Sequence, residues 1–317
     1  MSVAEHQFDV ITAGEAMALF MAADGAPLPA VRSFERTTAG AELNVAVGLA
    51  RLGLRVAYLS AVGDDSLGRH LLDCMDAEGI DRRHVRTDPY HPTGFMLKAQ
   101  PRDGADPEVE YFRRGSAASC LSAADLPDGA LPARLLHLTG ILPALSPGCR
   151  ELAHAMATRA RAAGSTITFD PNLRPRLWRS QGEMIAELNE LASRADVVLP
   201  GLAEGGLLTG RAEPAAIADF YLSRGVRLVI VKLGPGGAYV ATADEQRTVP
   251  GMPVAHVVDT VGAGDGFAAG VISALLEGLP PAAAAQRGNA VGARVVQYRG
   301  DCEGLPTRAQ LDALLSM

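Results

Sequence analysis

The segment DTVGAGDGF, residues 259–267, combines residue types that suit the binding of phosphate. Its surroundings predict a strand that ends near Val258, then a glycine-rich turn, then a helix that ends at Gly278. Such a turn leaves backbone amides unpaired at the positive end of the helix dipole, where they can bind an anion. The amides concerned are those of Gly262, Ala263 and Gly264.

Asp265 lies in the first turn of this predicted helix, where a carboxylate would repel a bound phosphate unless it had a chemical task. Accepting the proton of a hydroxyl group is such a task. The alternative is that Asp265 caps the helix and the glycines form an ordinary tight turn. Two other nucleotide motifs do not fit, because the P-loop pattern is absent and Phe267 occupies the last glycine position of GxGxxG.

The elements that must position this segment follow a regular order. Apolar strand-like runs alternate with amphipathic helical patterns along most of the chain, which predicts an α/β fold with a mainly parallel central sheet. The strands are apolar throughout, so we expect helices on both faces. Residues 15–38 and 92–115 instead show period-two patterns, which predict a small inserted β lid. The α/β domain would then comprise residues 1–14, 39–91 and 116–317, with approximate boundaries.

Composition excludes several classes of protein. A content of 48% hydrophobic and 21% charged residues is typical of a globular chain, and a net charge of -7 disfavours nucleic-acid or anionic-membrane partners. No apolar run approaches the ~18 residues of a spanning helix. The four cysteines show no CxxC spacing and the N-terminus shows no signal-peptide pattern, so we expect a cytoplasmic protein. The seven histidines show no metal-ligand spacing.

Two motifs together resemble those of the ribokinase-like (PfkB) carbohydrate kinases. The first is DTVGAGDGFAAG, and the second is AGAELNVAVGLARLG at residues 39–53. The segment SAVGDDSLG at residues 60–68 and the order of elements also agree, so the resemblance covers nearly the whole chain. It implies a three-layer α/β/α fold, Asp265 as general base, and the turn amides as anion hole. It also implies ATP with Mg²⁺, whereas a monovalent cation is left open.

The resemblance extends to nucleotide contacts. KLGPGGAYV at residues 232–240 resembles the strand-turn-strand that binds nucleotide in the family, although alone it would be an ordinary hairpin. Asn289, on the predicted penultimate helix, aligns with a position beside the adenine pocket of relatives. The residues implied to bind nucleotide are Lys232, Gly234, Gly236, Gly237, Gly262, Gly264 and Asn289.

One family motif is incomplete. The NxxE motif, which the resemblance implies organises Mg²⁺ and phosphate through water, reads GLAE at residues 201–204. Glu204 is present, but Gly201 replaces the asparagine. Glu204 is therefore implied as an indirect metal contact, with an ordinary helix-start acid as the alternative.

The acceptor must be inferred from other residues. A sugar acid presents a carboxylate, which the guanidinium fork of arginine pairs with well. Residues 110–119 and 169–178 resemble segments of the 2-keto-3-deoxygluconate kinases within the family, which implies that Arg113 and Arg174 face the substrate beside Tyr111. Met96 departs from this pattern, because several relatives place a hydrogen-bonding tyrosine there.

From the second motif, Gly40 and Asn44 are implied to contact sugar hydroxyls. The reaction implied is ATP-dependent phosphorylation of the terminal 6-hydroxyl of 2-keto-3-deoxygluconate. Open alternatives are a fructokinase, a kinase of the galactonate epimer, and a catalytically silent sensor of sugar acid or nucleotide. A lid with one apolar face also predicts a homodimer or higher homo-oligomer through the lid.

Overall fold

The computed structural model describes residues 7–100, 107–129, 131 and 133–316 of the chain. Nine strands form one sheet in the order β13-β12-β11-β10-β9-β8-β1-β4-β5. All neighbours in it are parallel except β11 with β12 and β12 with β13, which confirms the mainly parallel sheet. Its strands are β1 (Phe8–Ala13), β4 (Val56–Gly63), β5 (Asp81–Asp88), β8 (Ala133–Thr139), β9 (Thr166–Asp170), β10 (Val197–Val198), β11 (Leu228–Lys232), β12 (Ala238–Ala241) and β13 (Gln246–Val249).

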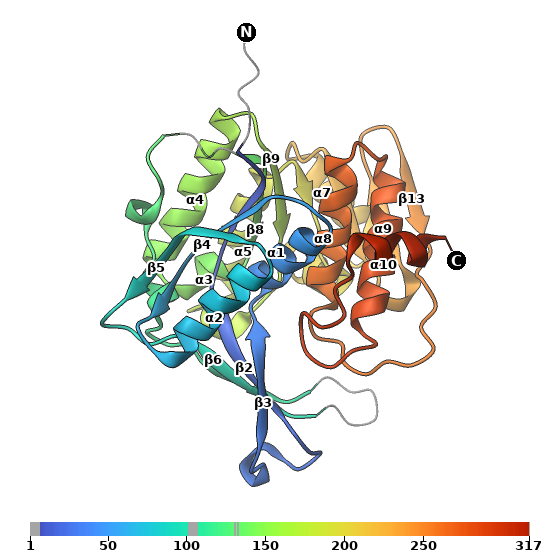
Figure 1. Cartoon of the computed structure of the whole chain (residues 1–317). Helices are drawn as coiled ribbons and strands as arrows, with labels where there is room; N and C mark the ends of the chain where they lie inside the picture. The colour runs from blue at the N-terminus through green and yellow to red at the C-terminus, as the bar shows by residue number, and fades with distance from the viewer. Residues whose placement is uncertain (1–6, 101–106, 130, 132, 317) are drawn as a thin grey trace.

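Helices cover both faces of this sheet, as Figure 1 shows. One layer contains α3 (Leu142–Leu145), α4 (Pro147–Ala162), α5 (Gln181–Ser193), α6 (Leu202–Thr209) and α7 (Pro214–Leu222). The other contains α1 (Ala41–Arg51), α2 (Ser66–Ala77), α8 (Ala263–Leu276), α9 (Pro281–Val295) and α10 (Arg308–Leu315).

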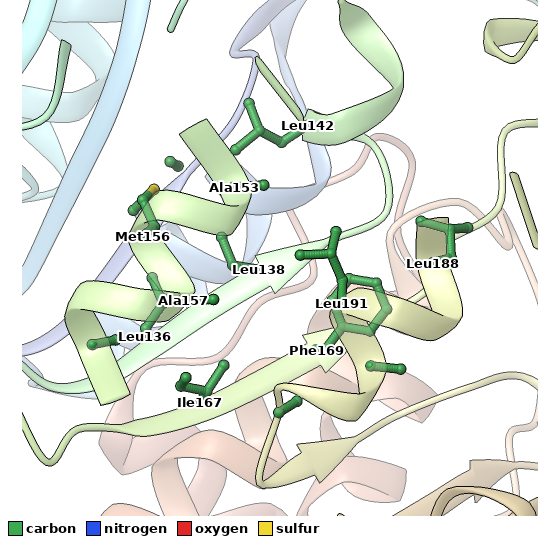
Figure 2. Close-up of a cluster of buried hydrophobic side chains, with 14 of the residues drawn as sticks. Leu136, Leu138, Leu142, Ala153, Met156, Ala157, Ile167, Phe169, Leu188 and Leu191 are labelled. Carbon is green, nitrogen blue, oxygen red and sulfur yellow. The ribbon is translucent and has the colours of Figure 1, made fainter. Parts of the chain in front are cut away.

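Alternation along the strands separates two hydrophobic cores. Leu136 packs into the core under α4 and α5, whereas its neighbour Leu135 packs into the core under α1 and α8. Successive strand residues point to opposite faces, so a strand buried on both sides must be apolar throughout. Figure 2 shows part of the first core, where Leu138, Ile167 and Phe169 lie against the helices. This packing holds the strand ends that carry the site.

A second sheet has four strands in the order β3-β2-β6-β7 and projects from the α/β body (Figure 1). Its strands are β2 (Met17–Ala22), β3 (Phe34–Ala39), β6 (Phe95–Lys98) and β7 (Val109–Phe112). They fall within the two ranges expected to form a small β lid, except that β3 extends one residue further, to Ala39. The exact domain boundaries stay a prediction; residues 101–106 of the second lid range and residues 1–6 of the α/β domain lie outside the described residues.

One predicted element is wrong. Residues 251–262 form no strand before α8; instead the amides of Val258 and Asp259 donate to the carbonyl of Val296. The apolar residues of this segment line a cavity rather than pair with a neighbouring strand, as Val254 and Val257 show. The predicted end of the helix is correct within two residues, since α8 ends at Leu276 and Gly278 adopts a φ of 79°.

Candidate active site

The carboxyl ends of the parallel strands, the start of α1 and the start of α8 surround a cavity of about 550 Å³. Side chains from the second sheet close it on one side, including Met96 and Tyr111. The predicted site residues among its lining are Gly40, Asn44, Tyr111, Arg113, Arg174, Glu204, Lys232, Gly262, Gly264 and Asp265. Residues from distant parts of the chain thus share one cavity.

Asp265 lies in the first turn of α8 and is 9% exposed. Its two carboxylate oxygens accept hydrogen bonds from two amides, with 2.7 Å from Asn44 Nδ2 to Oδ2 and 3.3 Å from Asn172 Nδ2 to Oδ1. Burial raises the pKa of Asp265 to about 7, even though the hydrogen bond from Asn44 opposes the shift. A carboxylate with this pKa is suited to take up a proton near neutral pH.

The turn before α8 has a backbone conformation that requires glycine. Gly262 adopts a φ of 83° as the N-cap of the helix, and a Cβ there would lie 2.5 Å from the carbonyl oxygen of Asp301. Only glycine fits this turn without strain. Gly264 lines the cavity, whereas the amide of Ala263 makes a long 3.4 Å hydrogen bond to the carbonyl of Thr260.

A second cavity of about 500 Å³ lies on the other side of this turn. Its lining is mainly apolar and glycine-rich, and it includes Gly234, Gly237 and Asn289 among the predicted nucleotide contacts. The side-chain amide of Asn289 donates to the carbonyl of Pro250 over 3.0 Å, which holds the loop that covers the cavity. Gly236 is not part of either lining.

Three residues line both cavities: Lys232, Thr260 and Gly264. Lys232 Nζ donates to Asp170 Oδ2 over 2.6 Å. Burial alone would lower the pKa of Lys232, but the carboxylates of Asp170 and Glu204 outweigh it and raise the pKa above its ordinary value. The pairing favours a positive charge on Lys232 where the two cavities meet, which is where a negatively charged group passing between them would need it.

Arg113 is not free in this structure. Its guanidinium pairs with Glu15 at 2.5 Å, and the side chains are 7% and 0% exposed. Ser116 Oγ donates to the other oxygen of Glu15. Arg174 differs, because it is half-buried and donates from one nitrogen to the carbonyl of Leu173 over 2.9 Å. Arg174 therefore retains the larger donor capacity for an anionic ligand.

Glu204 is also engaged. Its Oε2 accepts from the amide of Gly201 and its Oε1 from the amide of Leu173, each over 2.8 Å. The side chain closes a capping box at the start of α6. Its carboxylate nonetheless lines the first cavity beside Lys232. The position of Glu204 is thus compatible with both interpretations, an ordinary acid at the start of a helix and an indirect contact to a metal ion.

Sequence reasoning missed several residues of the site. Asp170 is the last residue of β9 and contacts Lys232, and Asn172, at a φ of 39°, lies two residues further on and contacts Asp265. Polar residues at the carboxyl end of a buried strand were the available signal. Glu15 lay in the predicted lid range and gave no signal, since its partner Arg113 is 98 positions away.

Comparisons with known proteins agree with this geometry. The family model of pfkB carbohydrate kinases matches residues 7–308. The 2-dehydro-3-deoxygluconokinase of Bacillus subtilis (strain 168) is 48% identical over 312 residues, which cover 98% of this chain and 96% of that protein.

Two crystal structures show the same fold. A PfkB protein from Polaromonas sp. JS666 gives a TM-score of 0.89 at 50% identity, with 96% of this chain and 99% of that chain covered. A putative ribokinase II from E. coli, in complex with ATP and Mg²⁺, gives 0.90 at 28% identity, with 98% and 99% covered. These matches confirm the predicted fold class.

Proposed function

This chain belongs to the pfkB family of carbohydrate kinases, and from that premise we propose that it phosphorylates the terminal 6-hydroxyl of 2-keto-3-deoxygluconate, also called 2-dehydro-3-deoxygluconate, with ATP. The chain is a sugar kinase by its family and by its relative in Bacillus subtilis. The proposal concerns the acceptor and the role of each residue. The observation that carries it is Asp265, buried in the first cavity beside the glycine turn, on whose other side the second cavity lies.

The transfer would proceed from the second cavity to the first. The acceptor hydroxyl loses its proton to Asp265 as its oxygen forms a bond to the γ-phosphorus, while the bond from that phosphorus to the ADP oxygen breaks. The amides of Gly262 and Gly264, with Ala263 between them, would bind the charge on the transferring group. Lys232 would act on the same group from the opposite side of the junction.

The nucleotide would occupy the apolar second cavity, with Lys232, Gly234, Gly236, Gly237 and Asn289 as its proposed contacts. Mg²⁺ fits this donor set as an ion held by phosphate oxygens and water, because Asp170 is paired with Lys232 and both oxygens of Glu204 accept from amides. Bound with the nucleotide, the ion would neutralise phosphate charge. Glu204 would contact its water shell. The role of a monovalent cation is tested by comparing rates in sodium, potassium and choline chloride.

The carboxylate of the acceptor would lie toward Arg174 and Arg113. Arg174 has donors that face the cavity, while Arg113 is held in place by Glu15 and is thereby oriented in advance. Tyr111 stands beside Arg113, with the guanidinium carbon 5.9 Å from the ring centroid. On the start of α1, Gly40 and Asn44 would contact acceptor hydroxyls. Met96, 2% exposed, contributes an apolar wall in place of a hydrogen bond.

A panel of acceptors tests the proposal. We expect kcat/KM for 2-keto-3-deoxygluconate to exceed the values for fructose and ribose by at least about tenfold, because a neutral sugar offers no carboxylate to pair with Arg174. The galactonate epimer belongs in the panel, since its carboxylate is identical. A preference for fructose would show a fructokinase instead. No turnover of any acceptor, with ATP still bound, would favour the silent sensor.

Two further proposals concern the whole molecule. Exposed Tyr111 and Phe112 on β7 support a homodimer through the second sheet, which light scattering of the purified protein tests. All four cysteines are free, which supports a reducing cytoplasmic location. No helix within the described part of the chain is long and apolar enough to cross a bilayer.

A further inference from the structure

The chain uses lysine at two positions in 317 residues, although it contains 29 lysines and arginines together. These positions are Lys98 and Lys232, and every other cationic side chain of this kind is an arginine. Lys232 lies between the two cavities described above. Lys98 lies on β6 of the second sheet and is 2% exposed. A chain that otherwise uses arginine thus places its two lysines in the interior, at the site.

Lys98 binds two carboxylates at once. Its Nζ lies 2.6 Å from Asp259 Oδ2 and 2.9 Å from Asp301 Oδ1, and these side chains are 2% and 4% exposed. Burial alone would lower the pKa of Lys98, but Asp301 and Asp259 outweigh it and raise the pKa above its ordinary value. Two buried carboxylates without a cation would repel each other strongly, so the ammonium is needed to hold them together.

Both carboxylates belong to segments that shape the glycine turn of Gly262, Ala263 and Gly264, called the anion turn below. Asp259 Oδ1 accepts from the amide of Val261 over 3.1 Å, which fixes the chain immediately before Gly262. Asp301 contributes its backbone, which packs directly against Gly262, so a Cβ at that glycine would lie 3.1 Å from Asp301 Cα. The ammonium therefore joins the two segments that determine where the amides of Gly262 and Gly264 point.

The side chain reaches this place from the opposite wall of the cavity. In the second sheet, Lys98 pairs with Met21 on β2 and with Val109 on β7. Met96, two residues earlier on β6, lines the substrate cavity, as does Tyr111 on β7. An ion pair between Lys98 and the loop before α8 thus ties the wall that would cover the acceptor to the turn that would bind the phosphoryl group.

We propose that Lys98 is a positioning residue for phosphoryl transfer, a cation built into the second sheet that holds the anion turn through Asp259 and Asp301. The proposal rests on the phosphoryl transfer proposed above but not on the identity of the acceptor. A compact ammonium can sit between two carboxylates, whereas a planar guanidinium needs a wider, fork-shaped site.

The test is rescue of Lys98→Ala by small cations. The acceptor is whichever panel compound the unchanged enzyme phosphorylates fastest. Removing the side chain leaves two carboxylates facing an empty space, so we expect kcat to fall about 100-fold in choline chloride. Ammonium or potassium chloride should raise the kcat of Lys98→Ala at least about tenfold, because the ion would occupy the vacated site. The increase in kcat should level off at high salt concentration, as expected for binding to a single site.

Three controls separate positioning from simple destabilisation. Lys98→Met fills the space without a charge, so it should lose activity and resist rescue. Glu35→Ala, an exposed residue of β3 in the same sheet, should behave like the unchanged enzyme. Unfolding temperatures of all variants are measured in each salt. Ammonium should raise the Tm of Lys98→Ala over its value in choline, and it should not do so for the unchanged enzyme or for Lys98→Met.

Each outcome decides the proposal. The proposal is overturned if folded Lys98→Ala has a kcat within threefold of that of the unchanged enzyme. It is also overturned if the kcat of this variant falls and no cation restores it. Equal rescue of Lys98→Met also overturns it, since that variant has no room for the ion. If the unchanged enzyme phosphorylates no acceptor, the proposed function fails, but the cation-specific Tm shift of Lys98→Ala still decides whether a cation at this position is needed to hold Asp259 and Asp301 together.

Discussion

Asn44 donates a hydrogen bond to Asp265 over 2.7 Å, and this bond joins the two sequence motifs across 221 positions of the chain. The orientation of the Asn44 amide is set from its other side, where Cys302 Sγ lies 3.0 Å from Asn44 Oδ1 as a donor. A donor aimed at Asp265 favours the ionised carboxylate, whereas burial favours the protonated one. The balance leaves the pKa of Asp265 at about 7.

Replacing Asp265 with asparagine should reduce kcat by at least about 1,000-fold, because the amide cannot accept the hydroxyl proton. The second cavity, which is proposed to bind the nucleotide, does not include this side chain, so the Kd for ATP should change less than about threefold. Steady-state kinetics and calorimetric titration with an ATP analogue measure the two quantities. Asp265→Asn with activity near that of the unchanged enzyme would remove Asp265 from the role of base.

The rate should depend on pH through Asp265. Since the base acts when deprotonated and its pKa is about 7, kcat/KM should rise as pH increases through that value and then level off. In Asn44→Ala the carboxylate loses its 2.7 Å donor, so the midpoint should move about one unit higher. Asn172→Ala should move it less, because that contact is 3.3 Å. An unchanged midpoint in Asn44→Ala would contradict this account.

Arg174→Ala should weaken the use of a keto acid selectively. Loss of one cationic partner of the carboxylate is expected to cost about 2 kcal/mol in kcat/KM, roughly 30-fold, with fructose affected less than about threefold. Arg113→Ala should in addition lower the Tm, because it leaves Glu15 buried without its partner. The double variant Arg113→Met with Glu15→Gln should regain much of the Tm that Arg113→Ala loses. Its kcat/KM for the keto acid should still be reduced more than its kcat/KM for fructose. Equal losses for acid and neutral sugar would argue for a neutral acceptor.

Gly262→Ala should disable the anion turn. The φ of 83° strains any L-residue, and a Cβ would meet the carbonyl of Asp301 at 2.5 Å, so kcat should fall by about 100-fold or more. Gly164→Ala is the matched control, because its φ of 75° imposes similar backbone strain while nothing lies within 4 Å of the added Cβ. That control should lower stability by about 1 kcal/mol and leave kcat unchanged.

Glu42 offers a test of stability against pH. Its side chain is fully buried, with Oε1 accepting from Thr139 and Oε2 without a hydrogen-bond partner among the described residues. Burial raises the pKa of Glu42 to about 7, so the folded state retains the proton over a range where the unfolded state has lost it. This group therefore contributes stability below its unfolded pKa, and the contribution is lost as pH rises through about 7.

Glu42→Gln removes that titration. The free energy of unfolding, measured in urea, should be similar for the variant and the unchanged protein at pH 5. At pH 8 the variant should be more stable by about 1 to 3 kcal/mol, because it buries no charge. A difference that does not grow between pH 5 and pH 8 would show that Glu42 titrates near its ordinary value.

The sequence was most informative about local structure and phosphate chemistry. Alternating apolar patterns predicted the parallel sheet and the second small sheet, and the glycine turn before α8 pointed to an anion site with Asp265 beside it. It failed for the segment that ends near Val258, which was predicted to be a strand although its apolar residues Val254 and Val257 line a cavity. An apolar sequence pattern indicates that side chains are shielded from water, but it does not distinguish a strand paired in a sheet from a loop that lines a cavity.

Charge pairing was decided by the tertiary structure alone. Arg113 looks from sequence like a free cation for a substrate, yet Glu15 lies against it, and Lys98 gave no signal until Asp259 and Asp301 surrounded it. Such pairs join residues about 100 to 200 positions apart, as the separations of 98 for Arg113 with Glu15 and 203 for Lys98 with Asp301 show. Local sequence determines which groups can ionise, whereas their charge and orientation depend on burial and on partners that the fold alone brings within reach.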